Sequence, residues 1–404
     1  MPVEDTWDRT LGFLLWTQGD MTDTEIQENA SDYWFVWSAA VWQADDFRIG
    51  NPQSGVGSYL PGFLDDENGR PNPYLPEDDS PELRARTLLW WNTEVDGVGH
   101  PDWILYLCDG ETPAYQRVET WPDPPATLPN APLDMSNPDV IEWQLRGIEG
   151  MQPGFTAFSA DLIDVRNWNH ACGVYRDGDW VQLFTGEPVD PAFSVAVLNW
   201  AKEMRSRLYA QAYPKGLVVN FSLDPNSSAD DVASLAASVD GILDEQGFTA
   251  FGLGRRYVSW LQKIEKMIEI QNQGIPVYSV NYVESYPPTQ DELEWILGSF
   301  LMAREHAAYI LITGIEKPEV RWPHLPEFAA DLGHPCAPMT ESQDVYVRDY
   351  SNGMAVVNPS LTSSYTFTLP PESFTDLYET PVEGYIDLEP LTGRVLLSSE
   401  PRCP

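Results

Sequence analysis

The chain has 404 residues, of which 62 are Asp or Glu and 23 are Lys or Arg, so its formal net charge is -39. Such a polyanion is not expected to bind DNA, RNA or anionic lipid headgroups. Hydrophobic residues make up 43% of the chain and aromatic residues 12%, which excludes a disordered protein. No apolar run approaches the roughly 18 residues of a membrane span, so we expect no membrane insertion.

Acidic residues are spread along the whole chain, whereas lysine is confined to Lys202, Lys215, Lys263, Lys266 and Lys317. Two interpretations of this excess stay open. A protein adapted to high salt tolerates such self-repulsion, because the Debye length falls to roughly 3 Å at 1 M salt. The other interpretation is an acidic secreted protein without that adaptation.

The four cysteines, Cys108, Cys172, Cys336 and Cys403, lie far apart without Cys-x-x-Cys spacing. Their spacing argues against a zinc site or thioredoxin-like chemistry and leaves disulfides open, without indicating their pairing. The N-terminus lacks the basic-then-apolar pattern of a signal peptide. We expect an extracellular protein whose signal has been trimmed, or one exported by another route, for example as part of a virion.

Short runs rich in β-branched and aromatic residues alternate with segments of helical periodicity, which indicates βαβ units. Strands are expected at residues 11–16, 33–38, 55–61, 155–161, 216–221, 241–245, 276–283 and 309–313. Helices are expected at 22–30, 81–95, 137–148, 191–209, 230–238, 255–273 and 291–306. The pattern predicts an α/β fold, a (β/α)8 TIM barrel. A doubly wound sheet with a nucleotide site is disfavoured, because no Gly-x-Gly-x-x-Gly or P-loop follows any strand.

Two segments interrupt the barrel pattern. Residues 102–134 are predicted to form a hairpin and a Pro-rich loop on the third βα connection, and residues 167–190 form a second insertion after the fourth strand. After His324 the segments "DVYVRDYSNGMAVVNPS", "SYTFTLP", "EGYIDLEP" and "GRVLLS" alternate with turn residues, which is typical of strands. We therefore expect a catalytic barrel over 1–325 and a small sandwich-like all-β domain over 340–404, packed rigidly on it.

Two acidic residues end barrel strands, where parallel barrels build their active sites. Asp161 closes the fourth strand in "GFTAFSAD", and Glu245 ends the sixth in "VDGILDE". Neighbouring side chains of a strand point to opposite faces, so either Asp244 or Glu245 can face the barrel mouth, and we favour Glu245. Two carboxylates flanking one bond are what glycoside hydrolysis needs, one as acid and one as nucleophile or base.

Further side chains are candidates for binding a sugar through polar groups or through stacking on an indole ring. They are Asp164, Asn220, Tyr282, Glu284, Trp16, Trp37 and Trp168. Structural roles compete with these functions: Asp161 would order its loop, and Glu245 would pair with Arg255 or Arg256.

Other chemistries fit the sequence poorly. The histidines are scattered and none ends a strand, so a metal-dependent hydrolase is disfavoured. No Gly-x-Ser-x-Gly elbow is present for a serine hydrolase. We therefore expect neither a metal nor an organic cofactor.

The segments "LLWTQGDMTD", "SYLPGF", "PLDMSNPDVIEWQL", "GFTAFSADLIDVRNWN", "DGILDEQGFT" and "VYVRDYSNGMAVVNPS" cover most of the chain. With them the chain resembles the barrel proteins grouped as hypothetical glycoside hydrolase family fifteen, which are distantly similar to polygalactosaminidase-like hydrolases. Related barrels carry an Asp after strand four and a Glu after strand six. The resemblance thus implies a glycosidase with Asp161 and Glu245 as its catalytic pair.

The sequence therefore predicts a glycoside hydrolase whose partner is a carbohydrate polymer or oligosaccharide. Two alternatives stay open. A barrel could keep a sugar groove and serve as a non-catalytic adhesin or virion appendage, and a purely structural scaffold would have no acidic cleft between strands four and six. Homo-oligomers and assembly into a virion are also left open.

Overall fold

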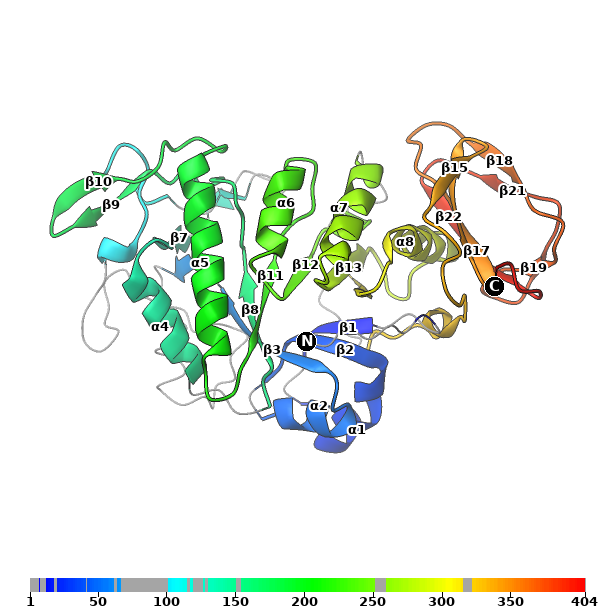
Figure 1. Cartoon of the computed structure of the whole chain (residues 1–404), viewed down its shortest axis with the longest axis horizontal. Helices are drawn as coiled ribbons and strands as arrows, with labels where there is room; N and C mark the ends of the chain where they lie inside the picture. Colours follow the sequence, from blue (N-terminus) through cyan, green and yellow to red (C-terminus); the bar gives the residue numbers. More distant parts are fainter. Residues whose placement is uncertain are drawn as a thin grey trace.

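The computed structural model describes residues 7, 12–17, 20–40, 42–61, 64–66, 101–114, 117–118, 126–127, 130–149, 154–250, 259–314 and 322–403. Eight strands close into a barrel in which every neighbouring pair is parallel (Figure 1). In chain order they are β1 (Gly12–Trp16), β2 (Tyr33–Ser38), β3 (Gly55–Pro61), β8 (Ala157–Asp161), β11 (Gly216–Asn220), β12 (Gly241–Asp244), β13 (Val277–Val283) and β14 (Ala308–Gly314). The predicted (β/α)8 barrel is confirmed.

Helices follow the strands and lie outside the barrel (Figure 1). They are α1 (Asp23–Asn29), α2 (Ala44–Gly50), α4 (Pro138–Glu149), α5 (Pro191–Tyr209), α6 (Ala229–Ala236), α7 (Trp260–Asn272) and α8 (Gln290–Ala303), with the 3-10 turns η1 (Ala30–Asp32), η2 (Pro101–Trp103) and η3 (Pro326–Ala329). The helix α2 was not expected, and the helix expected at 81–95 lies outside the described residues. None of the described helices is long and apolar enough to cross a membrane.

Side-chain alternation along the strands separates two hydrophobic cores. The inward-facing residues form a barrel interior that includes Phe13, Phe35, Val218, Leu243, Tyr278 and Leu311. The outward-facing residues, such as Leu217, Val219 and Ile242, pack instead with the helix layer. Since residues two apart on a strand share a face, this alternation also fixes which residues at the strand ends face the mouth of the barrel.

The two insertions contact each other. A disulfide joins Cys108 to Cys172, and Tyr106 pairs with Gly173 in an antiparallel bridge. The second insertion contains the hairpin of β9 (Gly173–Arg176) and β10 (Asp179–Gln182). The third connection contains the short strands β4 (Leu64–Asp66), β5 (Arg117–Val118), β6 (Ala126–Thr127) and β7 (Asn130–Pro132).

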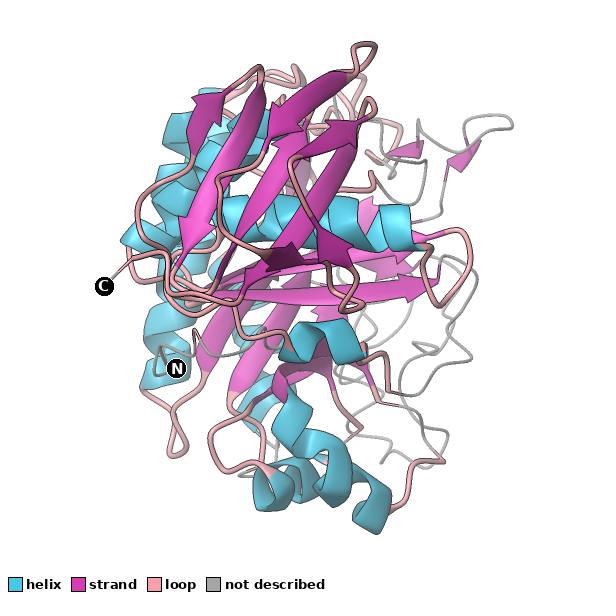
Figure 2. Cartoon of the chain, turned by 90° about the vertical axis from the view of Figure 1, so that its right-hand side faces the viewer, coloured by secondary structure: helices cyan, strands magenta, loops and turns pink. Residues whose placement is uncertain are grey.

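The C-terminal strands form two antiparallel sheets around a core of their own. One sheet has the order β15 (Thr340–Ser342), β16 (Val345–Tyr350), β17 (Gly353–Asn358), β22 (Thr392–Ser398), β19 (Phe374–Thr375) and β20 (Pro381–Val382), and the other pairs β18 (Tyr365–Thr368) with β21 (Tyr385–Leu388). Figure 2 shows the larger sheet in front of α8, against which β17 and β22 pack. A second disulfide joins Cys336 to Cys403.

The β domain is held to α8 by buried polar contacts as well as by apolar packing. Arg394 forms a 2.7 Å ion pair with the fully buried Glu294 of α8. Arg348 donates to the carbonyls of Leu301, Met302 and Arg304 at the C-terminal end of α8, where carbonyls lack donors from within the helix. These contacts favour a rigid attachment of the domain to the barrel.

Candidate active site

Four polar side chains meet at the carboxyl ends of neighbouring barrel strands. Asp161 ends β8, Asn220 ends β11, Glu245 directly follows β12, and Tyr282 lies near the end of β13. Each continues the inward-facing row of its strand: Asn220 lies two residues after Val218, Glu245 after Leu243, and Tyr282 after Val280. Strand alternation therefore turns all four side chains toward the mouth of the barrel.

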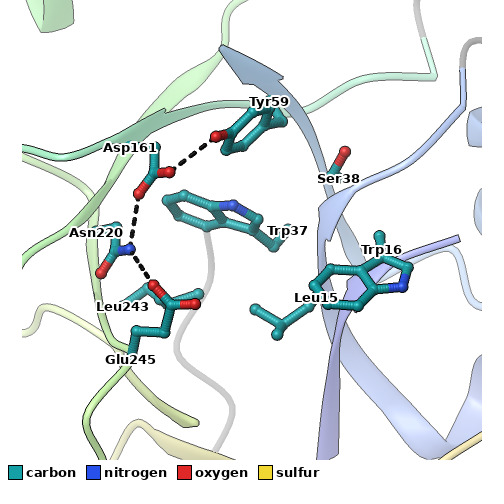
Figure 3. Close-up of a pocket in the computed structure, with 9 residues that line it drawn as sticks. All are labelled: Leu15, Trp16, Trp37, Ser38, Tyr59, Asp161, Asn220, Leu243 and Glu245. Atoms are coloured by element: carbon teal, nitrogen blue, oxygen red, sulfur yellow. Dashed lines mark hydrogen bonds between the residues drawn. The ribbon is translucent and has the colours of Figure 1, made fainter. Parts of the chain in front are cut away.

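A continuous hydrogen-bond chain connects these residues and Tyr59 of β3. The Tyr59 hydroxyl donates to Oδ2 of Asp161 at 2.8 Å, and Tyr282 donates to Oε1 of Glu245 at 2.7 Å. Between the two acids, Nδ2 of Asn220 donates to Oδ1 of Asp161 at 2.7 Å and to Oε2 of Glu245 at 2.9 Å (Figure 3). One amide nitrogen thus joins both carboxylates.

The environments of the two acids differ. Asp161 accepts a third hydrogen bond, from the backbone N–H of Leu162 at 2.8 Å, so its oxygens face three donors, an arrangement that suits an ionised carboxylate. Burial raises the pKa of Glu245, and the neighbouring charge of Asp161 raises it further, against the opposing hydrogen bonds from Tyr282 and Asn220. Glu245 therefore holds a proton more readily than a free glutamate does.

Asp244 faces the opposite way from Glu245, as strand alternation predicts. Its side chain is fully buried and forms an ion pair with Lys263 of α7. The choice of Glu245 over Asp244 as the acid at the barrel mouth therefore agrees with the geometry. Arg255 and Arg256, the alternative partners considered for Glu245, lie outside the described residues.

The two acids line a pocket that also has apolar residues in its lining. Trp16, Trp37 and Leu15 come from the first two barrel strands: Trp37 lies beside Asp161 and Glu245, and Leu15 and Trp16 lie farther across the pocket (Figure 3). Leu243 and Ser38 complete the lining together with Tyr59 and Asn220. An indole opposite a pair of carboxylates offers an apolar face for the C–H side of a sugar ring and polar groups for its hydroxyls.

Tyr282 bonds Glu245 but does not line this pocket, and three other candidate binding residues do not line it either. Asp164 accepts hydrogen bonds from the backbone N–H of Arg166 and from the indole N–H of Trp168, both at 2.8 Å, so both side chains order the loop after β8. Trp168 is nevertheless 40% exposed. Glu284, just after β13, is exposed. A role for these three in binding substrate stays a prediction.

Tyr59 is the site residue that sequence reasoning missed. It lies in the expected third strand, within the segment "SYLPGF". Its place beside the acid depends on the register of β3 and β8, which pairs Tyr59 with Ser159 and Pro61 with Asp161.

Among the described residues, no group of three or more His, Cys, Asp or Glu side chains is placed to hold a metal ion.

No protein-family model matches the sequence, and no curated protein matches it. Among solved structures, the chain is similar to the trehalulose synthase MutB from Pseudomonas mesoacidophila MX-45, with a TM-score of 0.49 and 10% identity over 98% of this chain and 100% of that chain. An alpha-amylase from Malbranchea cinnamomea gives a TM-score of 0.46 at 10% identity over 97% of each chain. The glycoside hydrolase domain of PelA from Pseudomonas aeruginosa gives 0.41 at 12% identity, over 74% of this chain and 93% of that chain. Likenesses this distant assign neither a family nor an activity.

Proposed function

We propose that the chain is a glycoside hydrolase that cleaves an extracellular or cell-surface polysaccharide with Asp161 and Glu245. The observation that carries this proposal is the Asn220 amide nitrogen, which hydrogen-bonds both carboxylates. It brings two acids of different environment close together at a Trp-lined pocket, near enough to flank one glycosidic bond as the two-carboxylate mechanism requires. The resemblance to family fifteen points to the same two residues.

The spacing of the acids favours hydrolysis with retention of configuration. Because both oxygens bond to one nitrogen, they lie no more than about 5.6 Å apart, the sum of 2.7 Å and 2.9 Å. Retaining enzymes hold their carboxyl groups roughly 5–5.5 Å apart, and inverting enzymes roughly 6.5–9.5 Å apart to leave room for a water molecule. The bound holds for one oxygen of each acid, Oδ1 of Asp161 and Oε2 of Glu245, and on it we base the proposal of a retaining reaction.

In the proposed reaction, protonated Glu245 gives its proton to the glycosidic oxygen, and the leaving sugar departs as an alcohol. A carboxylate oxygen of Asp161 bonds to the anomeric carbon as that bond breaks. Glu245, now ionised, then takes a proton from a water molecule, whose oxygen attacks the anomeric carbon and releases Asp161. Asn220 holds both carboxylates at the distance this exchange needs.

The cysteines support an extracellular location. All four are paired, Cys108 with Cys172 and Cys336 with Cys403, and no cysteine is free. Disulfides form and persist in oxidising compartments such as the cell exterior and are rare in the cytosol. The proposed polysaccharide substrate would be met in the same place.

A polysaccharide panel tests the proposal. The purified chain is incubated with each polymer, and both polymer binding and the release of reducing ends are measured, with Asp161→Asn and Glu245→Gln as controls. We expect one polymer to yield reducing ends with the wild-type chain and none with the controls. Binding of a polymer without release of ends would contradict the hydrolase and favour an adhesin.

A further inference from the structure

Two of the few lysines in this acidic chain are buried on the inner face of α7. Lys263 has no exposed surface and Lys266 is 8% exposed. Burying an ammonium group costs several kcal/mol unless its partners compensate. The contacts of Lys263 should therefore show which part of the structure its burial serves to hold in place.

The ammonium group of Lys263 contacts the chain on both sides of Glu245. It forms an ion pair with Asp244, the residue before Glu245, and donates a 2.7 Å hydrogen bond to the carbonyl of Gly247, two residues after it. Asp244 in turn accepts a hydrogen bond at 3.2 Å from the backbone N–H of Leu223, in the loop after β11. The turn that carries Glu245 is thus held from the helix side.

Strand β13 holds the same turn from the other side. Gly247 has a φ of +49°, and a Cβ there would lie 2.0 Å from the carbonyl oxygen of Val280, so the turn needs glycine. The next residue, Phe248, donates its N–H to Oδ1 of the buried Asn281 at 2.7 Å. The backbone after Glu245 is therefore fixed between α7 and β13.

We propose that Lys263 is a positioning residue for Glu245, acting through Asp244 and Gly247. This inference rests on the proposed function, which makes Glu245 the general acid. By fixing the backbone on both sides of Glu245, Lys263 keeps its carboxylate within reach of Asn220 and Tyr282. Stability alone is a weak reason for such a pair, because apolar residues of similar volume often replace buried ion pairs without loss.

The test removes the pair without leaving an unpaired buried charge. The double variant Asp244→Leu with Lys263→Met loses one anion and one cation together. Because the charge of Asp244 itself adds to the raised pKa of Glu245, the result is compared with Gly247→Ala, which changes no charge. The matched control is Lys215→Met. Lys215 is also buried, at 3% exposure, and donates to the carbonyls of Phe155 and Tyr213, but it precedes β11 at the opposite end of the barrel.

The first readout needs no substrate. The full chain is labelled with carboxyl-13C glutamate, and the Glu245 signal is assigned by its absence in Glu245→Gln and titrated by NMR. Because burial raises the pKa of Glu245, a side chain displaced into solvent should titrate at lower pH. We expect this shift in the double variant and not in Lys215→Met.

Gly247→Ala provides a second variant if the double variant does not fold, since its Cβ would push the turn away from β13 without changing any charge. It should give the same downward shift. An unchanged Glu245 titration in a folded double variant, or in folded Gly247→Ala, would overturn the positioning role.

Kinetics on a substrate found in the panel give the second readout. A displaced acid should lower kcat at least about tenfold while KM changes little, whereas Lys215→Met should keep both constants. Unchanged kcat in the folded double variant would also overturn the role. If the titration shifts as expected but the wild-type chain hydrolyses no polymer, the proposed function fails while the structural effect of Lys263 on Glu245 stands.

Discussion

The hydroxyl of Tyr282 donates a 2.7 Å hydrogen bond to Oε1 of Glu245. This bond favours the ionised carboxylate and holds the pKa of Glu245 lower than burial and the charge of Asp161 would set it. In Tyr282→Phe the pKa of Glu245 should therefore rise. Because a general acid must carry its proton, the upper limb of the pH profile of kcat/KM should move to higher pH.

Tyr59→Phe is the matched control for that experiment, because it removes the same group from Asp161 instead. It should lower the rate by about tenfold, the loss of one hydrogen bond to a charged group, and leave the upper limb in place. An upper limb that stays in place in Tyr282→Phe, or moves downward, would contradict the role of Glu245 as acid.

Asp164, in the loop after β8, should make the unfolding free energy of the chain depend on pH. Burial raises the pKa of Asp164 to about 6, despite hydrogen bonds from Arg166 and Trp168. A carboxyl group whose pKa is raised by folding stabilises the fold fully below its unfolded pKa, near 4, and this stabilisation is lost as pH rises through about 6. Between about pH 4 and pH 7, Asp164→Asn should gain on the order of 2 kcal/mol in unfolding free energy relative to wild type.

Denaturant unfolding across this pH range measures the Asp164 effect. The control is Asp230→Asn, which removes a carboxylate at an exposed position. Its unfolding free energy should change with pH in parallel with that of wild type. A difference between Asp164→Asn and wild type that does not vary with pH would contradict the prediction.

The ion pair of Arg394 with Glu294 should matter to the stability of the whole chain. Glu294 is fully buried and lies against β22, where a Cβ on Gly393 would come within 2.6 Å of its backbone carbonyl. Arg394→Met leaves that carboxylate without its cation, which should cost about 3 kcal/mol. Arg207→Met, which breaks an exposed pair with Glu142, should cost under about 1 kcal/mol. Equal losses in denaturant unfolding would show that the buried pair has no special role.

The net charge of -39 predicts that salt stabilises the fold. Raising NaCl from about 0.1 M to about 2 M shortens the Debye length and screens the repulsion between acids, so we expect Tm at neutral pH to rise by at least about 5 °C. Repeating the calorimetry near the isoelectric point gives the control, because the net charge there is close to zero and the salt effect should shrink. The same rise at both pH values would point to a general salt effect on hydrophobic packing.

Strand periodicity predicted most of the fold and the two acids that meet at the mouth of the barrel. The alternation of two residues puts Glu245 on the same inner face as Leu243 and Asp244 on the opposite face, as the sequence predicted, whereas the pairing of Asp244 with Lys263 was not predicted. Tyr59 could not be found in this way, because the register between β3 and β8 is set by packing between strands about 100 residues apart in the chain. Whether Asp161 and Glu245 converge also depended on closure of the barrel.

Other features depended on contacts that no local pattern encodes. The pairing of Cys108 with Cys172 follows from the way the two insertions meet. The helix α2 has no side-chain cap at its N-terminus, and it packs on α1, where Gln27 donates to its Asp46 at 2.8 Å. A helix of this length depends on tertiary packing more than on its own sequence.

The rate of polysaccharide cleavage by Asp161→Asn and Glu245→Gln tests the central claim most directly. Both substitutions keep the shape of the side chain and remove its ability to ionise. On a polymer that the wild-type chain cleaves, we predict that each lowers kcat by at least about 1,000-fold while the thermal unfolding curve stays cooperative. Wild-type rates in either amide variant would contradict a two-carboxylate mechanism at this pocket.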